Sequence, residues 1–217
     1  MKTILLAATR FLMRPHFILC VLFCSTNLIS INSFAQCTPV GDPSVFGNNV
    51  WNVYAWNSGG ANINDDAWNL NYAGYYVEPS VSLYTWDRWA TTTSPSFASS
   101  YTGCPVNIDN HSWSAKRQGF PCGHYLISIA YHDDAAQLFI DGVNVWEHDG
   151  CCDYHPNVWE GDLGENSKVE FRVTEGEQES VAGISINQKE TAIIANGNML
   201  CSGGSVLLTS NAASGNQ

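Results

Sequence analysis

Residues 122–152 read CGHYLISIAYHDDAAQLFIDGVNVWEHDGCC, and they are the most informative part of the chain about its fold class. It contains three short runs rich in β-branched, aromatic and other apolar residues, at Tyr125–Tyr131, Gln137–Ile140 and Val143–Glu147. Asp141-Gly142 separates the last two runs. Because a type I′ turn requires positive φ at both central positions, this dipeptide predicts a two-residue β-hairpin.

An acidic doublet, Asp133-Asp134, separates the first run from the second. Successive side chains of a strand point to opposite faces of its sheet. Two neighbouring carboxylates therefore reach one ion only where the backbone between them departs from strand geometry. A cis peptide is one such departure, although it is rare before a residue other than proline.

The same pattern of short strands extends outward in both directions and is interrupted by Gly, Asn, Asp, Ser and Pro. No convincing amphipathic helix follows the first 35 residues, so the sequence predicts an all-β sandwich or barrel. All eight tryptophans lie between Trp51 and Trp159, where they can fill a core. The further predicted strands are Val50–Trp56, Tyr72–Val77, Val81–Tyr84, Ser112–Lys116, Lys168–Val173 and Val181–Ile186.

The order of these motifs resembles the core of a PA14 domain. The matching features are Gly123-x-Tyr125 with alternating apolar residues, the Asp-Asp doublet, Leu-Phe-Ile-Asp-Gly, and an aromatic residue ahead of twin cysteines. The resemblance covers about Gly119–Cys152 and is strongest to the glycan-binding PA14 domains of microbial surface adhesins. Asn157–Phe171 fits the next strands of this family less specifically, and Trp51–Trp113 resembles a version of the module from secreted bacterial proteins. It implies a PA14-like antiparallel β-sandwich or barrel over residues 36–188.

The resemblance also implies a calcium site. Asp133 and Asp134 would hold the ion and contact sugar hydroxyls, and a later loop, here Thr174–Ser180, would complete the shell. Glu175, Glu177 and Glu179 of that loop are the candidate ligands, in place of the asparagine side chain and main-chain carbonyls expected in the adhesins. Carboxylate oxygens suit calcium, which is a hard cation. The alternative is an acidic doublet satisfied by backbone N–H groups beside a solvated acidic hairpin.

Four further side chains are candidates for contact with a sugar. Trp146, Tyr154 and Trp159 lie near the twin cysteines and could stack on a sugar face, although aromatic residues of a β-sandwich are more often part of its core. His111 could rim such a site, or could simply be hydrogen-bonded within the domain.

Residues 1–35 read as a signal peptide, with a short basic stretch, an apolar core and a small-residue cleavage pattern at Ser33-Phe34-Ala35. Its removal leaves six basic residues against 20 acidic ones, a net charge near −14. This balance argues against nucleic acid and anionic membranes as partners. We therefore expect a secreted or cell-surface protein without membrane insertion after cleavage.

Six cysteines follow the cleavage site, and an exported chain is expected to pair them. The preferred prediction is Cys104 with Cys122, while Cys37 would pair with Cys151 or Cys152. A bond between Cys151 and Cys152 is the less favoured alternative, because adjacent Cα atoms are only about 3.8 Å apart. Zinc is not suggested, since there is no CxxC motif and the histidines are scattered along the chain.

The chain after the predicted domain divides into a linker, residues 189–198, and a segment, residues 199–217, that resembles the first strand of an Ig-like repeat. This predicts a truncated Ig-like remnant and downstream Ig-like repeats in a longer protein. The predicted function is calcium-dependent recognition of carbohydrate or cell-surface glycan, without enzymatic activity, because no catalytic motif is present. The alternatives are a structural cap or spacer and an accessory module of a polysaccharide-degrading enzyme.

Overall fold

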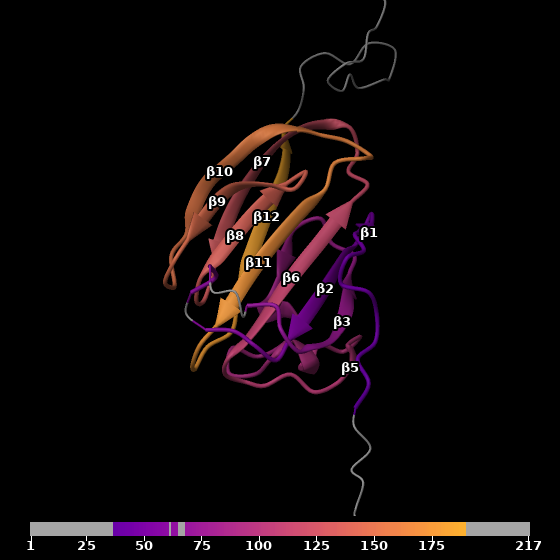
Figure 1. Cartoon of the computed structure of the whole chain (residues 1–217). Coiled ribbons are helices and arrows are strands. Elements are labelled where there is room, and N and C mark those ends of the chain that lie inside the picture. Colours follow the sequence, from indigo (N-terminus) through magenta and orange to yellow (C-terminus); the bar gives the residue numbers. More distant parts are fainter. Residues whose placement is uncertain (1–36, 61, 65–67, 190–217) are drawn as a thin grey trace, which may run out of the picture. The chain divides into compact units, whose positions relative to one another are not determined.

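A computed structural model describes residues 37–60, 62–64 and 68–189 of the chain (Figure 1). The predicted signal peptide, nearly all of the linker and the Ig-like segment lie outside these residues. Within them no helix is long and apolar enough to cross a membrane. The helices there are single 3-10 turns, η1 (Thr85–Asp87) and η2 (Pro95–Phe97). The strands are β1 (Gly47–Asn48), β2 (Trp51–Trp56), β3 (Tyr72–Glu78), β4 (Leu83–Tyr84), β5 (Thr102–Gly103), β6 (His111–Gln118), β7 (Gly123–Tyr131), β8 (Ala136–Ile140), β9 (Val143–His148), β10 (His155–Leu163), β11 (Val169–Glu175) and β12 (Gly183–Lys189).

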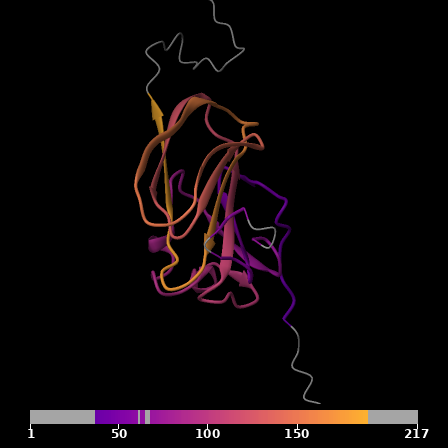
Figure 2. The same cartoon turned by 60° about the vertical axis from the view of Figure 1, so that its left-hand side comes forward.

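The strands form two sheets, seen from two sides in Figures 1 and 2. The first has the order β5-β3-β2-β6-β11-β8-β9, with β1 beside β6, and the second has the order β10-β7-β12-β4. All the strand pairs are antiparallel except the two-residue pair of β1 and β6. This confirms the predicted all-β class and its antiparallel sheets.

The two sheets share one hydrophobic core, and strand alternation explains which residues enter it. Along β7 the side chains of Tyr125, Ile127 and Ile129 are buried, and along β11 those of Val169, Phe171 and Val173 are buried. Trp113 of β6 lies at the centre, with its ring 5.6 Å from that of Phe171 and 6.1 Å from that of Trp89. Burial of large aromatic side chains from both sheets fixes the pairing register, because a one-residue slip would expose them.

The hairpin between β8 and β9 has the predicted turn. Asp141 and Gly142 have φ values of 50° and 81°, so both central residues occupy the left-handed region that a type I′ turn requires. The Asp141 carboxylate also accepts a hydrogen bond of 2.7 Å from the backbone N–H of Lys168. Asp141 therefore acts as a turn residue that ties the hairpin to the start of β11.

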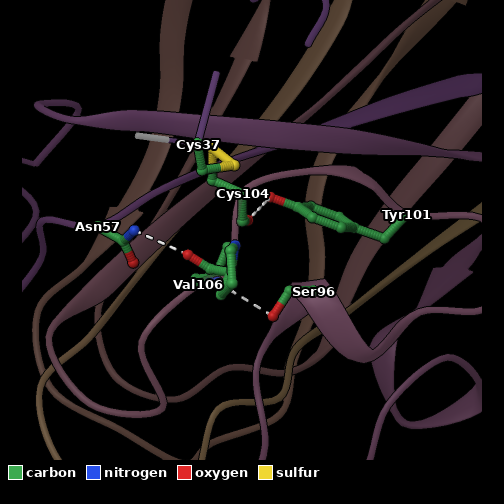
Figure 3. Close-up of a disulfide and its surroundings, with 7 residues drawn as sticks. Cys37, Asn57, Ser96, Tyr101, Cys104 and Val106 are labelled. Carbon is green, nitrogen blue, oxygen red and sulfur yellow. Dashed lines mark hydrogen bonds between the residues drawn. A yellow bond between two sulfur atoms is a disulfide. The ribbon is translucent and has the colours of Figure 1, made fainter. Parts of the chain in front are cut away.

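The disulfide pairing differs from the preferred prediction. Cys37 pairs with Cys104, with Cα atoms 5.6 Å apart (Figure 3), and Cys151 pairs with Cys152, with Cα atoms 3.5 Å apart. The predictions of Cys104 with Cys122 and of Cys37 with Cys151 or Cys152 are therefore wrong. Cys122 is also disulfide-bonded.

The topology explains why Cys104 and Cys122 do not meet. The backbone N–H of Cys104 donates to the carbonyl of Ala73, next to the edge strand β5 of the first sheet, whereas Cys122 precedes β7 in the second sheet. Hydrogen bonds hold the chain around Cys104 in place, from the Tyr101 hydroxyl to the Cys104 carbonyl (2.7 Å) and from the Val106 N–H to the Ser96 hydroxyl (3.1 Å; Figure 3). The bond between Cys37 and Cys104 thus fixes the start of the domain to the β5 edge.

Candidate functional site

Three carboxylates meet where β7 ends, β8 begins and β11 ends. Asp133 and Asp134 lie in the short connection between β7 and β8, and the peptide bond between them is cis. Glu175 is the last residue of β11. One carboxylate oxygen from each of the three residues lies within 4.8 Å of the others. We call Asp133, Asp134 and Glu175 the acidic cluster.

Backbone hydrogen bonds bring the doublet beside the end of β11. The N–H of Asp134 donates to the Thr174 carbonyl (2.7 Å), and the N–H of Thr174 donates to the Ala135 carbonyl (3.0 Å), which extends the β8–β11 ladder past β8. The Asp134 carboxylate also accepts a 2.8 Å hydrogen bond from the N–H of Gly176. Residues far apart in the sequence therefore face one another because β8 and β11 are neighbours.

The electrostatics of the acidic cluster are unfavourable for three bare carboxylates. Glu175 is fully buried, and neither of its carboxylate oxygens has a hydrogen-bond partner within the described residues. Burial, followed by the charges of Asp134 and Asp133, raises the pKa of Glu175 to about 9. Burial and the adjacent Asp134 raise the pKa of Asp133 to about 6. The site therefore favours either a proton or a bound cation between these oxygens.

The structure places only one of the three loop glutamates in the acidic cluster. Glu179 is exposed and lies outside it, although its charge helps to raise the pKa values of Asp133 and Glu175. Glu177 is exposed and also lies outside. Asp109, which was not among the predicted site residues, also raises the pKa of Glu175 and accepts a hydrogen bond from the N–H of Gln178.

The predicted aromatic residues have different surroundings. Tyr154 is 62% exposed, whereas Trp159 on β10 is partly buried and packs against the hydrophobic core. Trp146 on β9 is half-buried, with its ring 5.7 Å from that of His132. The sulfur atoms of Cys151 and Cys152 and a carboxylate oxygen of Asp133 lie within 4.8 Å of one another. The turn that precedes Tyr154 therefore borders the acidic cluster.

The prediction that His111 rims a ligand site is wrong. His111 is fully buried, with ring nitrogens bonded to the Ser180 hydroxyl (2.7 Å) and the Ile108 carbonyl (2.9 Å). Burial lowers the pKa of His111 to about 4. Its role is to join the start of β6 to the loop after β11, beneath the surface.

Three other histidines come together beside the acidic cluster, and no local motif in the sequence indicates that they do. His132 follows β7, His148 ends β9 and His155 begins β10. One ring nitrogen of each lies within 4.8 Å of the others. Their separation along the sequence follows no metal-binding motif, so only the pairing of β9 with β8 and of β10 with β7 shows that they meet.

No protein-family model matches this chain, and no curated protein matches its sequence. Among solved structures, it is similar to a PA14 sugar-binding domain from an RTX adhesin, with a TM-score of 0.48, 13% identity, and coverage of 65% of this chain and 91% of that one. It is also similar to the PA14 domain of the antifreeze protein MpAFP, with a TM-score of 0.42, 15% identity, and coverage of 71% and 90%. A GH31 α-xylosidase from Xanthomonas citri matches with a TM-score of 0.35, 12% identity, and coverage of 62% and 13%. Because these TM-scores are at most 0.48 and these identities at most 15%, the chemistry of the site rests on this chain's own residues.

Proposed function

We propose that the described domain is a calcium-dependent carbohydrate-recognition module of an exported surface protein. The observation that carries this proposal is the buried Glu175 carboxylate, which has no hydrogen-bond partner among the described residues and faces Asp133 and Asp134. An ion would remove the repulsion among the three groups. Because all the ligand atoms are carboxylate oxygens, the acidic cluster fits a hard cation such as calcium better than a softer metal.

The acidic cluster alone does not complete a calcium shell. Calcium takes about six to eight oxygen ligands, and Asp133, Asp134 and Glu175 offer at most six carboxylate oxygens. One of these, on Asp134, already accepts a hydrogen bond from Gly176. Water or the vicinal hydroxyls of a sugar would supply the remaining ligands, since a diol offers two oxygens at suitable spacing. Binding of a sugar would therefore depend on the ion.

The surroundings of the acidic cluster suit a sugar ring. The exposed Tyr154 follows the turn that borders Asp133, so its apolar ring face is available for stacking. Other acidic groups near the cluster, Asp109 and Glu179, give the site a negative field that attracts cations but not anionic ligands. We therefore expect a neutral, hydroxyl-rich glycan. Affinity at one such site would be weak, and several copies on one surface would raise it through avidity.

The experiment that tests this function is a calorimetric titration of calcium into the purified, chelator-treated chain. The wild type is compared with Glu175→Gln and with Asp133→Asn/Asp134→Asn, while Glu177→Gln serves as the matched control in the same loop. We expect micromolar to millimolar binding in the wild type and in the control, and none in the cluster variants. A glycan screen with and without chelator follows. Absence of calcium binding by the folded wild type would overturn the proposal and favour a structural spacer.

A further inference from the structure

A group of three imidazoles lies next to the acidic cluster and has no part in the function proposed above. His132, His148 and His155 come from the ends of three strands, and their ring centroids are 4.6 to 5.1 Å apart. The Nε2 atoms of His132 and His155 are 3.0 Å from each other. We call these residues the histidine cluster.

Hydrogen bonding determines which nitrogen of His132 is available. Its Nδ1 lies 2.5 Å from the backbone carbonyl oxygen of Asp134. A carbonyl oxygen only accepts, so Nδ1 carries the proton and Nε2 presents a lone pair toward His155. This is the arrangement of a metal-binding histidine, whose second nitrogen donates to a carbonyl or carboxylate that fixes the ring.

The other two rings are also prepared to bind an ion. The Nδ1 atom of His148 is buried and has no hydrogen-bond partner within the described residues. Such an unpaired buried nitrogen is unfavourable unless something occupies the space in front of it. The ring of Trp146 packs 5.0 Å from His155 and 5.7 Å from His132, which makes one wall of the histidine cluster apolar. His148 and His155 are only half-buried, so an ion can enter from solvent.

We propose that His132, His148 and His155 bind a divalent transition-metal ion of the zinc class. Imidazole nitrogens suit zinc, copper and nickel, whereas calcium requires oxygen. Nitrogens at about 2.1 Å from a tetrahedral zinc ion are about 3.4 Å apart, so small side-chain rotations from the observed spacing suffice. Three protein ligands leave a fourth position for water or a donor from another molecule.

This site is separate from the calcium site but is connected to it by one residue. Asp134 contributes its carboxylate to the acidic cluster and its backbone carbonyl to the Nδ1 proton of His132. The two sets of ligand atoms do not overlap. Zinc binding therefore does not rest on the calcium proposal, and each can fail without the other.

The test is a titration of zinc alone into the metal-free, oxidised chain, followed by calorimetry and by competition with a chelating dye. We expect one ion per chain with micromolar or tighter affinity. His148→Gln and His155→Gln should each weaken binding about tenfold or more. His124→Gln, the matched control, changes another histidine, on β7, that contacts Asp162 and Glu160, and should leave the affinity unchanged. Circular dichroism verifies that each variant is folded.

Cobalt provides a second readout, which distinguishes metal binding from a purely structural role of these histidines. Co²⁺ in a tetrahedral nitrogen site gives intense visible absorption, which should appear in the wild type and disappear in His148→Gln. Glu175→Gln should bind zinc as the wild type does. No zinc binding by the folded wild type would overturn the proposal. Wild-type affinity in both His148→Gln and His155→Gln, or loss of zinc binding only in Glu175→Gln, would also overturn it, because the ion would then lie elsewhere.

Discussion

At the scale of single residues, replacing Glu175 should have opposite effects on the stability of the domain and on its binding of calcium. In the metal-free protein, burial and two aspartates raise the pKa of its carboxyl to about 9, so near pH 7 folding has to add a proton to it. A glutamine of the same shape avoids that cost and should be more stable there. We expect Glu175→Gln to raise the melting temperature of the calcium-free chain by a few degrees, at about 2–4 °C per kcal/mol. Calcium should then no longer raise it. Thermal unfolding with calcium and with chelator measures both effects.

Glu177→Gln and Glu179→Gln are the controls for this prediction, because both residues are exposed in the same loop. The first should change neither melting temperature, and the second should weaken the calcium response only slightly through the lost charge. If Glu175→Gln lowered the stability of the calcium-free chain, its carboxyl would be part of a favourable network and the repulsion argued above would be wrong.

The lowered pKa of His111 predicts how the stability of the domain changes with pH. Its folded pKa is about 4, below the ordinary value of 6.5, so the unfolded chain binds the proton more readily. Stability from this group is complete above about pH 6.5 and is lost as the pH falls toward 4. Between pH 7 and pH 5 the loss is about 2 kcal/mol. Urea unfolding at the two pH values should show a smaller difference in His111→Gln than in the wild type; an equal difference would assign the effect to other groups.

Single residues also show what the sequence could and could not predict about the site. Asp133 and Asp134 were identifiable because they interrupt a strand pattern, and Glu175 because the resemblance names the loop that contains it. Asp109 and the histidine cluster were not identifiable, because their partners are far away in the sequence and no local spacing connects them. His111 was misassigned because burial of a polar residue at the start of a strand depends on the loop that covers it.

At the scale of elements, the β8–β9 hairpin closely follows the Asp133-Asp134 doublet. Adding one methyl group at its turn tests the turn geometry. Gly142 has a φ of 81° with open space around its Cα, so alanine there meets only backbone strain. Left-handed geometry costs an L-residue about 1–2 kcal/mol, and we expect Gly142→Ala to lose about that amount in urea unfolding. Gly60→Ala, also in open space but without positive φ, should be nearly neutral. Equal losses would indicate that the turn is not strained by a side chain.

Elements were predictable where one face is buried. β7, β8 and β11 were predicted within a few residues from their alternation. β9 has no fully buried residue and was predicted from the Asp141-Gly142 turn before it. The residue pattern did not predict β10, although the resemblance placed strands in Asn157–Phe171. β10 is an edge strand with mostly half-buried or exposed side chains, contains Pro156, and is irregular between His155 and Trp159. Asn157 in that irregularity has a φ of 54°. Because pairing with its neighbour β7 keeps this segment extended, its own sequence needs little alternation of apolar and polar residues.

At the scale of the whole domain, cysteine pairing depends on which sheet edges are neighbours, and that information is absent from local sequence. The two disulfides of known pairing should therefore differ strongly in their effect on stability. The bond between Cys37 and Cys104 joins residues 67 apart in the sequence, whereas Cys151 and Cys152 are adjacent. In the chain-entropy account, a loop of the first size is worth about 4 kcal/mol, and a bond between neighbours restricts the unfolded chain very little.

We therefore expect Cys37→Ser/Cys104→Ser to lower the melting temperature by about 10 °C, and Cys151→Ser/Cys152→Ser to lower it far less. Binding should show the opposite order. Four strands separate β5 from β8 in the first sheet, so loss of the first bond should leave calcium affinity unchanged below the melting temperature. The twin cysteines border Asp133, so loss of the second bond should weaken it. Melting curves and calcium titrations on both variants measure the two effects. Similar behaviour of the two variants in both experiments would contradict the expectation that the bond at the β5 edge stabilises the domain while the bond beside Asp133 supports the proposed calcium site.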